Sequence, residues 1–148
     1  RSDPKDPRYL AAYADILIKM QNYDEAIYYY NKAMTEGENS ASPKLAAIYY
    51  HLGKAAETNG LSGDAIRLFR KAIHLDGKNK NYHHEIGTLF LKQQRFKEAM
   101  VAFEAALHID PTFADAYANK EICAFKLGQN AVAQHAGDGN TKLYQKRN

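Results

Sequence analysis

The densest group of side chains able to bind a metal or move a proton is His83-His84-Glu85. Histidine and glutamate are zinc ligands, but a helix brings two ligands together when they are three or four residues apart. Adjacent residues on a helix point about 100° apart, so these three side chains do not converge. The group therefore indicates a polar helix surface, and we expect neither a metal ion nor a cofactor.

Other catalytic motifs are equally weak. Cys123 is the only cysteine, which excludes an intramolecular disulfide, and its neighbours include no activating group. The stretch Leu52-Gly53-Lys54-Ala55 lacks the glycine spacing and the serine or threonine of a phosphate-binding loop. The remaining histidines are isolated in the sequence: His51, His74, His108 and His135. We therefore predict that the chain is not an enzyme.

Composition narrows the class of protein further. The chain has 148 residues, of which 45% are apolar and 25% charged, and its net charge is +3. The basic residues are scattered, so the electrostatic pattern of a nucleic-acid binder is missing. No run of apolar residues is long enough to span a membrane. The start, Arg1-Ser2-Asp3-Pro4, has no methionine and no apolar leader, so we expect no signal peptide and a processed product or a piece of a longer protein. The compartment stays open, with the cytoplasm favoured.

The elements that position these side chains are indicated by an internal repeat. Tyr23-Asp24-Glu25-Ala26-Ile27 resembles Ser62-Gly63-Asp64-Ala65-Ile66 and Phe96-Lys97-Glu98-Ala99-Met100. An aromatic residue follows each alanine by four places, and a second alanine follows three places later. The last two copies are 34 residues apart and the first two are 39 apart. A period near this length predicts stacked supersecondary units.

The first unit reads as a helix–turn–helix hairpin. Apolar residues recur at helical spacing over about 8–21 and again over about 24–36. Asn22-Tyr23 forms the break between them, and Gly37 follows the second helix as a left-handed stop.

The next two units repeat this plan. Ser42-Pro43 predicts a helix start, with serine as the cap and proline in the first position. That helix runs to about Asn59 and is one turn longer than its equivalents, which absorbs most of the five extra residues; a second helix covers 64–75. The third unit covers about 81–109, and Asp110-Pro111 closes it.

These units resemble the tetratricopeptide repeat (TPR), whose pattern has a small residue after a leucine in the first helix and alanines around an aromatic in the second. The first unit matches at Leu10, Tyr13, Ala14, Leu17, Ala26, Tyr30 and Ala33. The second matches at Tyr49, Leu52, Gly53, Ala56, Ala65, Phe69 and Ala72. The third matches at His83, Ile86, Gly87, Phe90, Ala99, Phe103, Ala106 and Pro111. The resemblance implies an all-α fold, a right-handed superhelical solenoid of antiparallel helix pairs.

The repeats divide the chain into segments. We expect an N-terminal extension (1–6), three repeats (7–40, 41–79 with a lengthened first helix, and 80–113), a partial fourth repeat (114–136) and a tail (137–148). The fourth unit begins like the others, with Ala114 and Tyr117, and places Gly128 at the usual turn. It departs at Glu121, Gly137 and Asn140. We therefore expect a capping helix over about 115–127, a turn at 137–140, and a tail that is either frayed or docked through Leu143-Tyr144.

The resemblance also implies a binding surface. In TPR-like stacks the first helices line a concave groove, which binds a peptide or protein segment, as in an adaptor or scaffold. The positions that would carry this groove are Tyr50, His51, Lys54, His84, Glu85, Thr88, Leu91, Asn119 and Ile122.

One specificity device of the family is missing. Chaperone-binding members hold a terminal carboxylate with asparagines and basic residues, at positions occupied here by Ala12, His51, Glu85 and Asn119. Glu85 would repel a carboxylate, so we do not predict this clamp. Lys19, Lys92 and Lys126 share another groove position, and we interpret them as solvated charges.

Three alternatives stay open. The chain is a self-assembling scaffold that associates through its stack ends or its tail, or it is the non-catalytic TPR part of a larger multidomain protein. An RNA-binding helical repeat is the third, although such arrays are usually longer and more basic. The sequence does not name the partner.

Overall fold

The computed structural model describes residues 5–135, which contain seven α-helices and no strand. The helices are α1 (Pro7–Lys19), α2 (Tyr23–Thr35), α3 (Ala41–Thr58), α4 (Ser62–Leu75), α5 (Lys80–Lys92), α6 (Phe96–Ile109) and α7 (Ala114–His135). Two compact units divide the chain, residues 1–82 and 83–148. The first unit holds α1 to α4 and the start of α5. None of the described helices has the length and apolarity needed to cross a bilayer.

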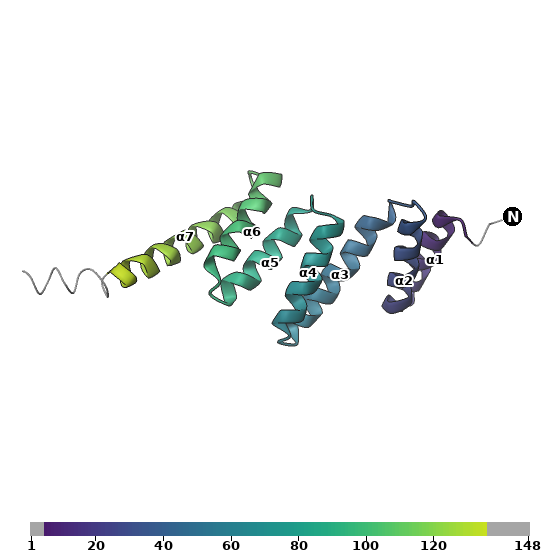
Figure 1. Ribbon diagram of the computed structural model, residues 1–148, viewed down its shortest axis with the longest axis horizontal. Coiled ribbons are helices and arrows are strands. Elements are labelled where there is room, and N and C mark those ends of the chain that lie inside the picture. Colours follow the sequence, from purple (N-terminus) through teal and green to yellow (C-terminus); the bar gives the residue numbers. More distant parts are fainter. Residues whose placement is uncertain (1–4, 136–148) are drawn as a thin grey trace, which may run out of the picture. The chain divides into compact units, whose positions relative to one another are not determined.

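The first hairpin pairs α1 with α2, which lie side by side at the purple end of the chain (Figure 1). Pro7 opens α1, and the Asp6 carboxylate caps it by accepting a hydrogen bond from the Arg8 amide at 2.9 Å. Asn22 caps α2 in the same way, through the Glu25 amide at 3.4 Å. Gly37 follows α2 with φ +99°, a conformation that suits glycine. The predicted stop at Gly37 is confirmed, whereas the break lies at residues 20–22 because Tyr23 is already the first residue of α2.

The start of α3 differs from the prediction. The helix begins at Ala41, so Ser42 lies inside its first turn and is not the cap. The Ser42 hydroxyl instead donates to the carbonyl of Leu75, the last residue of α4, at 2.7 Å. That bond satisfies one of the carbonyls that a helix end leaves without a partner. Pro43 costs little here, because amides of the first turn have no intrahelical acceptor.

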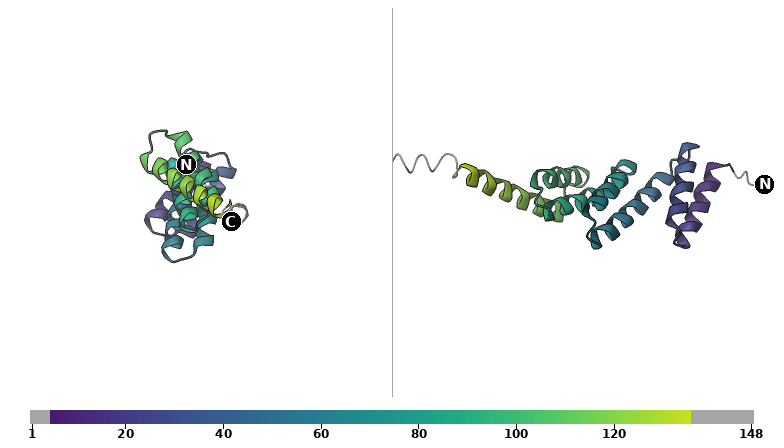
Figure 2. Two further views of the ribbon diagram at one scale, coloured as in Figure 1. Left: turned by 90° about the vertical axis from the view of Figure 1, so that its left-hand side faces the viewer. Right: turned by 60° about the horizontal axis from the view of Figure 1, so that its bottom comes forward.

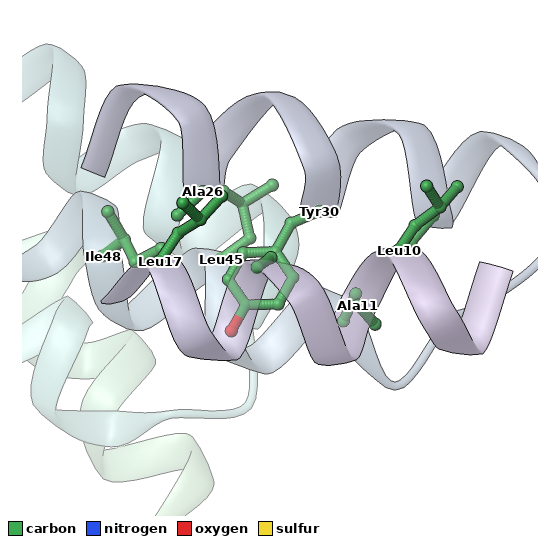
Figure 3. Packing of buried hydrophobic residues seen from close by; sticks show 10 residues of the cluster. Leu10, Ala11, Leu17, Ala26, Tyr30, Leu45 and Ile48 are labelled. Carbon is green, nitrogen blue, oxygen red and sulfur yellow. The ribbon is translucent and has the colours of Figure 1, made fainter. Parts of the chain in front are cut away.

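A single apolar cluster joins α1, α2 and the start of α3 (Figure 3). The Tyr30 ring lies at its centre beside Leu17 and Leu45, and only 2% of Tyr30 is exposed. The other buried members are Leu10, Ala11, Ala14, Ala26, Ala33, Ala41 and Ile48. Ala41 belongs to the turn that α3 has in addition to its equivalents, so the extra turn contributes to the core.

Small residues allow the helices of each hairpin to pack closely. A Cβ atom on Gly53 would lie 2.7 Å from the ring of Phe69, which is fully buried in α4. A Cβ atom on Gly87 would lie 2.8 Å from the ring of Phe103 in α6. Both distances are shorter than a van der Waals contact, so any larger residue forces the ring or the helix to move.

The second unit contains most of α5 together with α6 and α7 (Figure 2). Its buried apolar side chains are those of Ile86, Leu89, Phe90, Ala99, Ala102, Phe103, Ala106, Ala116 and Cys123. Along α7, Cys123 is fully buried, whereas residues 128–134 are all exposed.

The predicted end of the fourth helix is wrong. The sequence indicates a turn at Gly128, but α7 continues through it to His135. No atom lies within 4 Å of a Cβ built on Gly128, so neither crowding nor a positive φ requires glycine there. A glycine inside a helix costs only about 1 kcal/mol, which is too little to end it. The predicted turn at 137–140 and the contact of Leu143-Tyr144 lie outside the described residues.

Candidate functional site

A hollow of about 570 Å³ lies in the first unit, between α1 and α3. We call it the α1–α3 hollow. Both helices are the first helices of their hairpins, and α2 adds two tyrosines. The lining residues are Asp15, Ile18, Lys19, Tyr23, Tyr30, Lys44, Ala47, Ile48 and His51.

A hydrogen-bonded triad crosses this hollow. The Lys44 ammonium donates to both oxygens of Asp15, at 3.0 and 2.7 Å, and the Tyr30 hydroxyl donates to Oδ1 of the same carboxylate. Burial alone would raise the pKa of Asp15, but the hydrogen bonds from Lys44 and Tyr30 outweigh it and lower that pKa. Asp15 is therefore a carboxylate whose charge is compensated by Lys44.

The lengthened α3 makes this triad possible. Helix α3 has 18 residues, whereas α1 and α5 have 13 each. Its additional turn carries Lys44 to Asp15 on α1, and Ser42 to the end of α4. The extra turn thus contacts α1 through Lys44 and α4 through Ser42.

The rest of the lining is mixed in character. Lys19 and His51 are exposed, and Tyr23 is 41% exposed. Ile18 and Ile48 supply apolar surface. Asp15 is paired with Lys44 and is also attracted by Lys19, so the two lysines leave the lining with an excess of positive charge. The hollow is therefore suited to an apolar side chain together with a polar or acidic group.

The predicted residues of the first unit have different environments. His51 lines the α1–α3 hollow. Lys54 forms an ion pair with Glu57 at 3.3 Å. Tyr50 packs in an aromatic cluster, with ring centroids 5.1 Å from Tyr82 and 5.9 Å from Phe69.

In the second unit, the structure brings three predicted residues together. The rings of His84 and Phe113 are 4.9 Å apart, and Nε2 of His84 lies 3.2 Å from Nδ2 of Asn119. Thr88 donates to the His84 carbonyl at 2.9 Å within α5. His84 and Asn119 thus link α5 to α7 by packing and hydrogen bonding.

The other three residues of this unit are spread over two helices. Glu85 and Leu91 are half-buried on α5, and Ile122 is 46% exposed on α7. Of these, Ile122 offers the most apolar surface to a partner.

Sequence reasoning missed part of the α1–α3 hollow. The residues predicted for the groove include His51 of this hollow but not Asp15, Lys19, Tyr23 or Lys44. Lys44 lies in the extra turn of α3, outside the 34-residue repeat. The only available signal was the longer spacing between the first two repeats.

Outside this hollow, the described residues offer neither a metal site nor an activated cysteine. No three metal-binding side chains come together there. Burial raises the pKa of the Cys123 thiol, which disfavours the reactive thiolate.

Comparison with known proteins identifies the family. Two sequence profiles, both described as tetratricopeptide repeat, match residues 8–78 and 50–114. Together they cover most of the chain and all three predicted repeats. The chain belongs to the tetratricopeptide repeat family, whose members are generally non-catalytic modules for protein–protein interaction.

Related sequences and solved structures agree with this assignment. The chain is 28% identical to the Hsp70-Hsp90 organizing protein of Triticum aestivum, over 85% of this chain and 27% of that protein. It is also 28% identical to an uncharacterized protein of Haemophilus influenzae, over 70% of this chain and 56% of that one. The chain thus spans about a quarter to about half of these relatives.

Two solved structures confirm the predicted all-α solenoid class. The first is MamA protein, with a TM-score of 0.55 at 20% identity, covering 86% of both chains. The second is the APC/C hetero-tetramer Cut9-Hcn1, with a TM-score of 0.54 at 19% identity, covering 81% of this chain and 24% of that one.

Proposed function

We propose that this chain is an adaptor or scaffold module that binds a protein segment in the α1–α3 hollow. The observation that carries the proposal is the combination of exposed Lys19, His51 and Tyr23 around apolar Ile18 and Ile48. Such a lining suits one apolar anchor of an extended peptide with polar contacts at its sides. The triad of Asp15, Lys44 and Tyr30 keeps the wall in place.

The contacts proposed from the sequence are refined by these environments. In the first unit, His51 and Lys54 remain candidate contacts, whereas Tyr50 supports the fold. In the second unit, Ile122, Leu91 and Glu85 remain candidates. His84 and Asn119 hold α5 and α7 together, and Thr88 bonds the His84 carbonyl within α5.

Binding to a chaperone terminus is not part of the proposal. The name of the wheat relative points to two chaperones, but the clamp positions here hold Ala12, His51, Glu85 and Asn119. Glu85 brings a negative charge where a carboxylate would have to bind.

Affinity capture from a lysate tests the groove. A variant with Lys19→Ala, Tyr23→Ala and His51→Ala should lose its captured partners, while its helical circular dichroism stays unchanged. The matched control replaces the same residue types elsewhere, at Lys97, Tyr28 and His108, all exposed. Equal capture by both variants would contradict the proposal.

A second candidate function is self-association, favoured by one surface of α7. A hollow of about 580 Å³ is lined by Phe125, Gly128, Gln129, Val132 and Ala133. Phe125 is 64% exposed and Val132 is 69% exposed. Apolar surface of this kind commonly marks a contact, and a second copy of the chain would cover it.

Sedimentation velocity at two protein concentrations tests this candidate. The wild type should sediment faster at the higher concentration, and a Phe125→Gln, Val132→Gln variant should not. A wild type that remains a monomer at both concentrations excludes self-association.

A further inference from the structure

A second hollow in the first unit differs from the site described above. It has a volume of about 340 Å³ and lies among α2, α3 and α4. We call it the α2–α4 hollow. Its lining residues are Asn31, Leu45, Tyr49, Arg70, Lys71, His74 and Leu75, none of which lines the α1–α3 hollow.

The floor of the α2–α4 hollow is apolar and its rim is basic. Leu45 is fully buried, and Tyr49 and Leu75 are partly buried. Arg70 and Lys71 are exposed on α4. His74 follows one turn after Arg70, and none of the described residues that line the hollow is a carboxylate.

Arg70 differs from the other arginines of the described chain. Arg8 pairs with Asp6, Arg67 with Asp64 and Arg95 with Glu98. Among the described residues, Arg70 has no carboxylate partner. Its guanidinium therefore keeps its bidentate hydrogen-bonding capacity for another molecule.

Lys71 is held at the same rim by an aromatic contact. Its ammonium lies 5.1 Å from the centre of the Tyr49 ring, within the range of a cation–π interaction. This contact orients the side chain, and no carboxylate of residues 5–135 pairs with the ammonium. Two adjacent cations thus stand above an apolar floor.

The packing of α4 fixes the position of this rim. Phe69 and Ala72 are fully buried on either side of Arg70 and Lys71 in the sequence. The Ser42 hydroxyl holds the carbonyl of Leu75 at the end of the helix. The buried Phe69 and Ala72 fix the rotation of α4 about its axis, and the bond from Ser42 fixes its end. The basic side chains therefore project from a helix of defined position.

We propose that the α2–α4 hollow binds an acidic peptide segment of a partner protein. An aliphatic or aromatic side chain of the segment lies on Leu45, Tyr49 and Leu75. A neighbouring aspartate or glutamate accepts two hydrogen bonds from Arg70 and is attracted by Lys71. A nucleic acid is a poorer match, because its backbone needs a long basic track, whereas this rim is short.

Fluorescence anisotropy with a labelled probe peptide tests the proposal. The probe is a blocked peptide with glutamates on both sides of a central leucine, and its control has glutamines instead. Arg70→Gln in the full chain should weaken binding by about tenfold, the loss expected when one charged hydrogen-bonded pair is removed. Arg67→Gln, one turn earlier on the same helix, removes the same charge outside the hollow and should change binding by less than about twofold, as an exposed pair does.

Four outcomes would overturn the inference. Equal losses from Arg67→Gln and Arg70→Gln would mean diffuse attraction and no site. Tighter binding of an oligouridylate than of the peptide would make the hollow a nucleic-acid site. Equal binding of the glutamine peptide would exclude charge recognition. Loss of the peptide only in the Lys19, Tyr23, His51 variant would place it in the α1–α3 hollow.

Discussion

Gly53 and Gly87 show how one residue sets the distance between two helices. Each faces a buried phenylalanine ring of its partner helix, at 2.7 and 2.8 Å from the position of a Cβ atom. Ala14 occupies the equivalent place in α1 and is fully buried. Close packing of the two helices therefore requires a small residue at this position of the repeat, as the sequence pattern predicts.

Gly87→Ala should destabilise the protein by about 1–3 kcal/mol, because the added methyl overlaps the Phe103 ring. A urea melt measures the difference. Gly63→Ala is the control, since no atom lies within 4 Å of its Cβ position; it should leave stability unchanged or raise it by up to about 1 kcal/mol. Equal effects of both substitutions would disprove the close contact.

Asp15 should make the first unit sensitive to acid. Its pKa is lowered in the folded protein, so the unfolded chain takes up a proton at higher pH than the folded one. The ion pair with Lys44 stabilises the fold fully above the ordinary pKa near 3.8 and is lost as the pH falls through the lowered value.

The Asp15→Asn variant checks this dependence. Its stability deficit relative to the wild type should be largest near pH 7 and should shrink below about pH 4, where the wild type loses the same ion pair. Lys44→Gln should show the same trend, and the two substitutions together should be less than additive. A deficit that stays constant from pH 7 to pH 3 would contradict this account.

At the scale of elements, the extra turn of α3 is the main departure from a regular repeat. It places Ala41 in the core, Ser42 on α4 and Lys44 on α1. Local patterns predicted that the helix is longer, but not what the added turn contacts, because those partners lie 29 and 33 residues away in the sequence.

Ser42→Ala tests the contact between the start of α3 and the end of α4. Removing the hydroxyl leaves the Leu75 carbonyl without its donor, which should cost about 0.5–1.5 kcal/mol in the free energy of unfolding. Ser62 is also partly buried, and α4 has no side-chain capping hydrogen bond, so Ser62→Ala should cost less than about 0.5 kcal/mol. Amide hydrogen exchange in the Ser42→Ala variant should increase at the end of α4 as well. An increase confined to the start of α3 would mean that Ser42 acts only as a helix cap.

At the scale of the whole chain, the repeat predicted the fold class correctly. The repeat is recognised from the spacing of apolar and small residues within each helix, which is local information. The helices follow from apolar periodicity, but two of their ends differ from the prediction. Helix α3 begins at Ala41, before Ser42-Pro43, and α7 continues past Gly128, because a lone glycine in a helix is only a weak stop signal.

The candidate site was harder to predict than the fold. A groove position in the family pattern does not reveal whether a side chain meets solvent or a neighbouring ring. The Tyr50 ring contacts Tyr82, and the His84 ring contacts Phe113. Each partner lies about 30 residues later in the sequence. Lys44 lies outside the repeat, so no family position corresponds to it.

The hydrogen bond between Tyr30 and Asp15 also allows ultraviolet absorbance to follow the opening of the first unit. Burial, followed by the Asp15 carboxylate, raises the pKa of Tyr30 far above its ordinary value of 10.0. The chain has 11 tyrosines and no tryptophan, so phenolate absorbance follows tyrosine ionisation alone. In an alkaline titration Tyr30 should ionise well above its ordinary pKa of 10.0, and this delayed step should coincide with the opening of the α1–α2 hairpin.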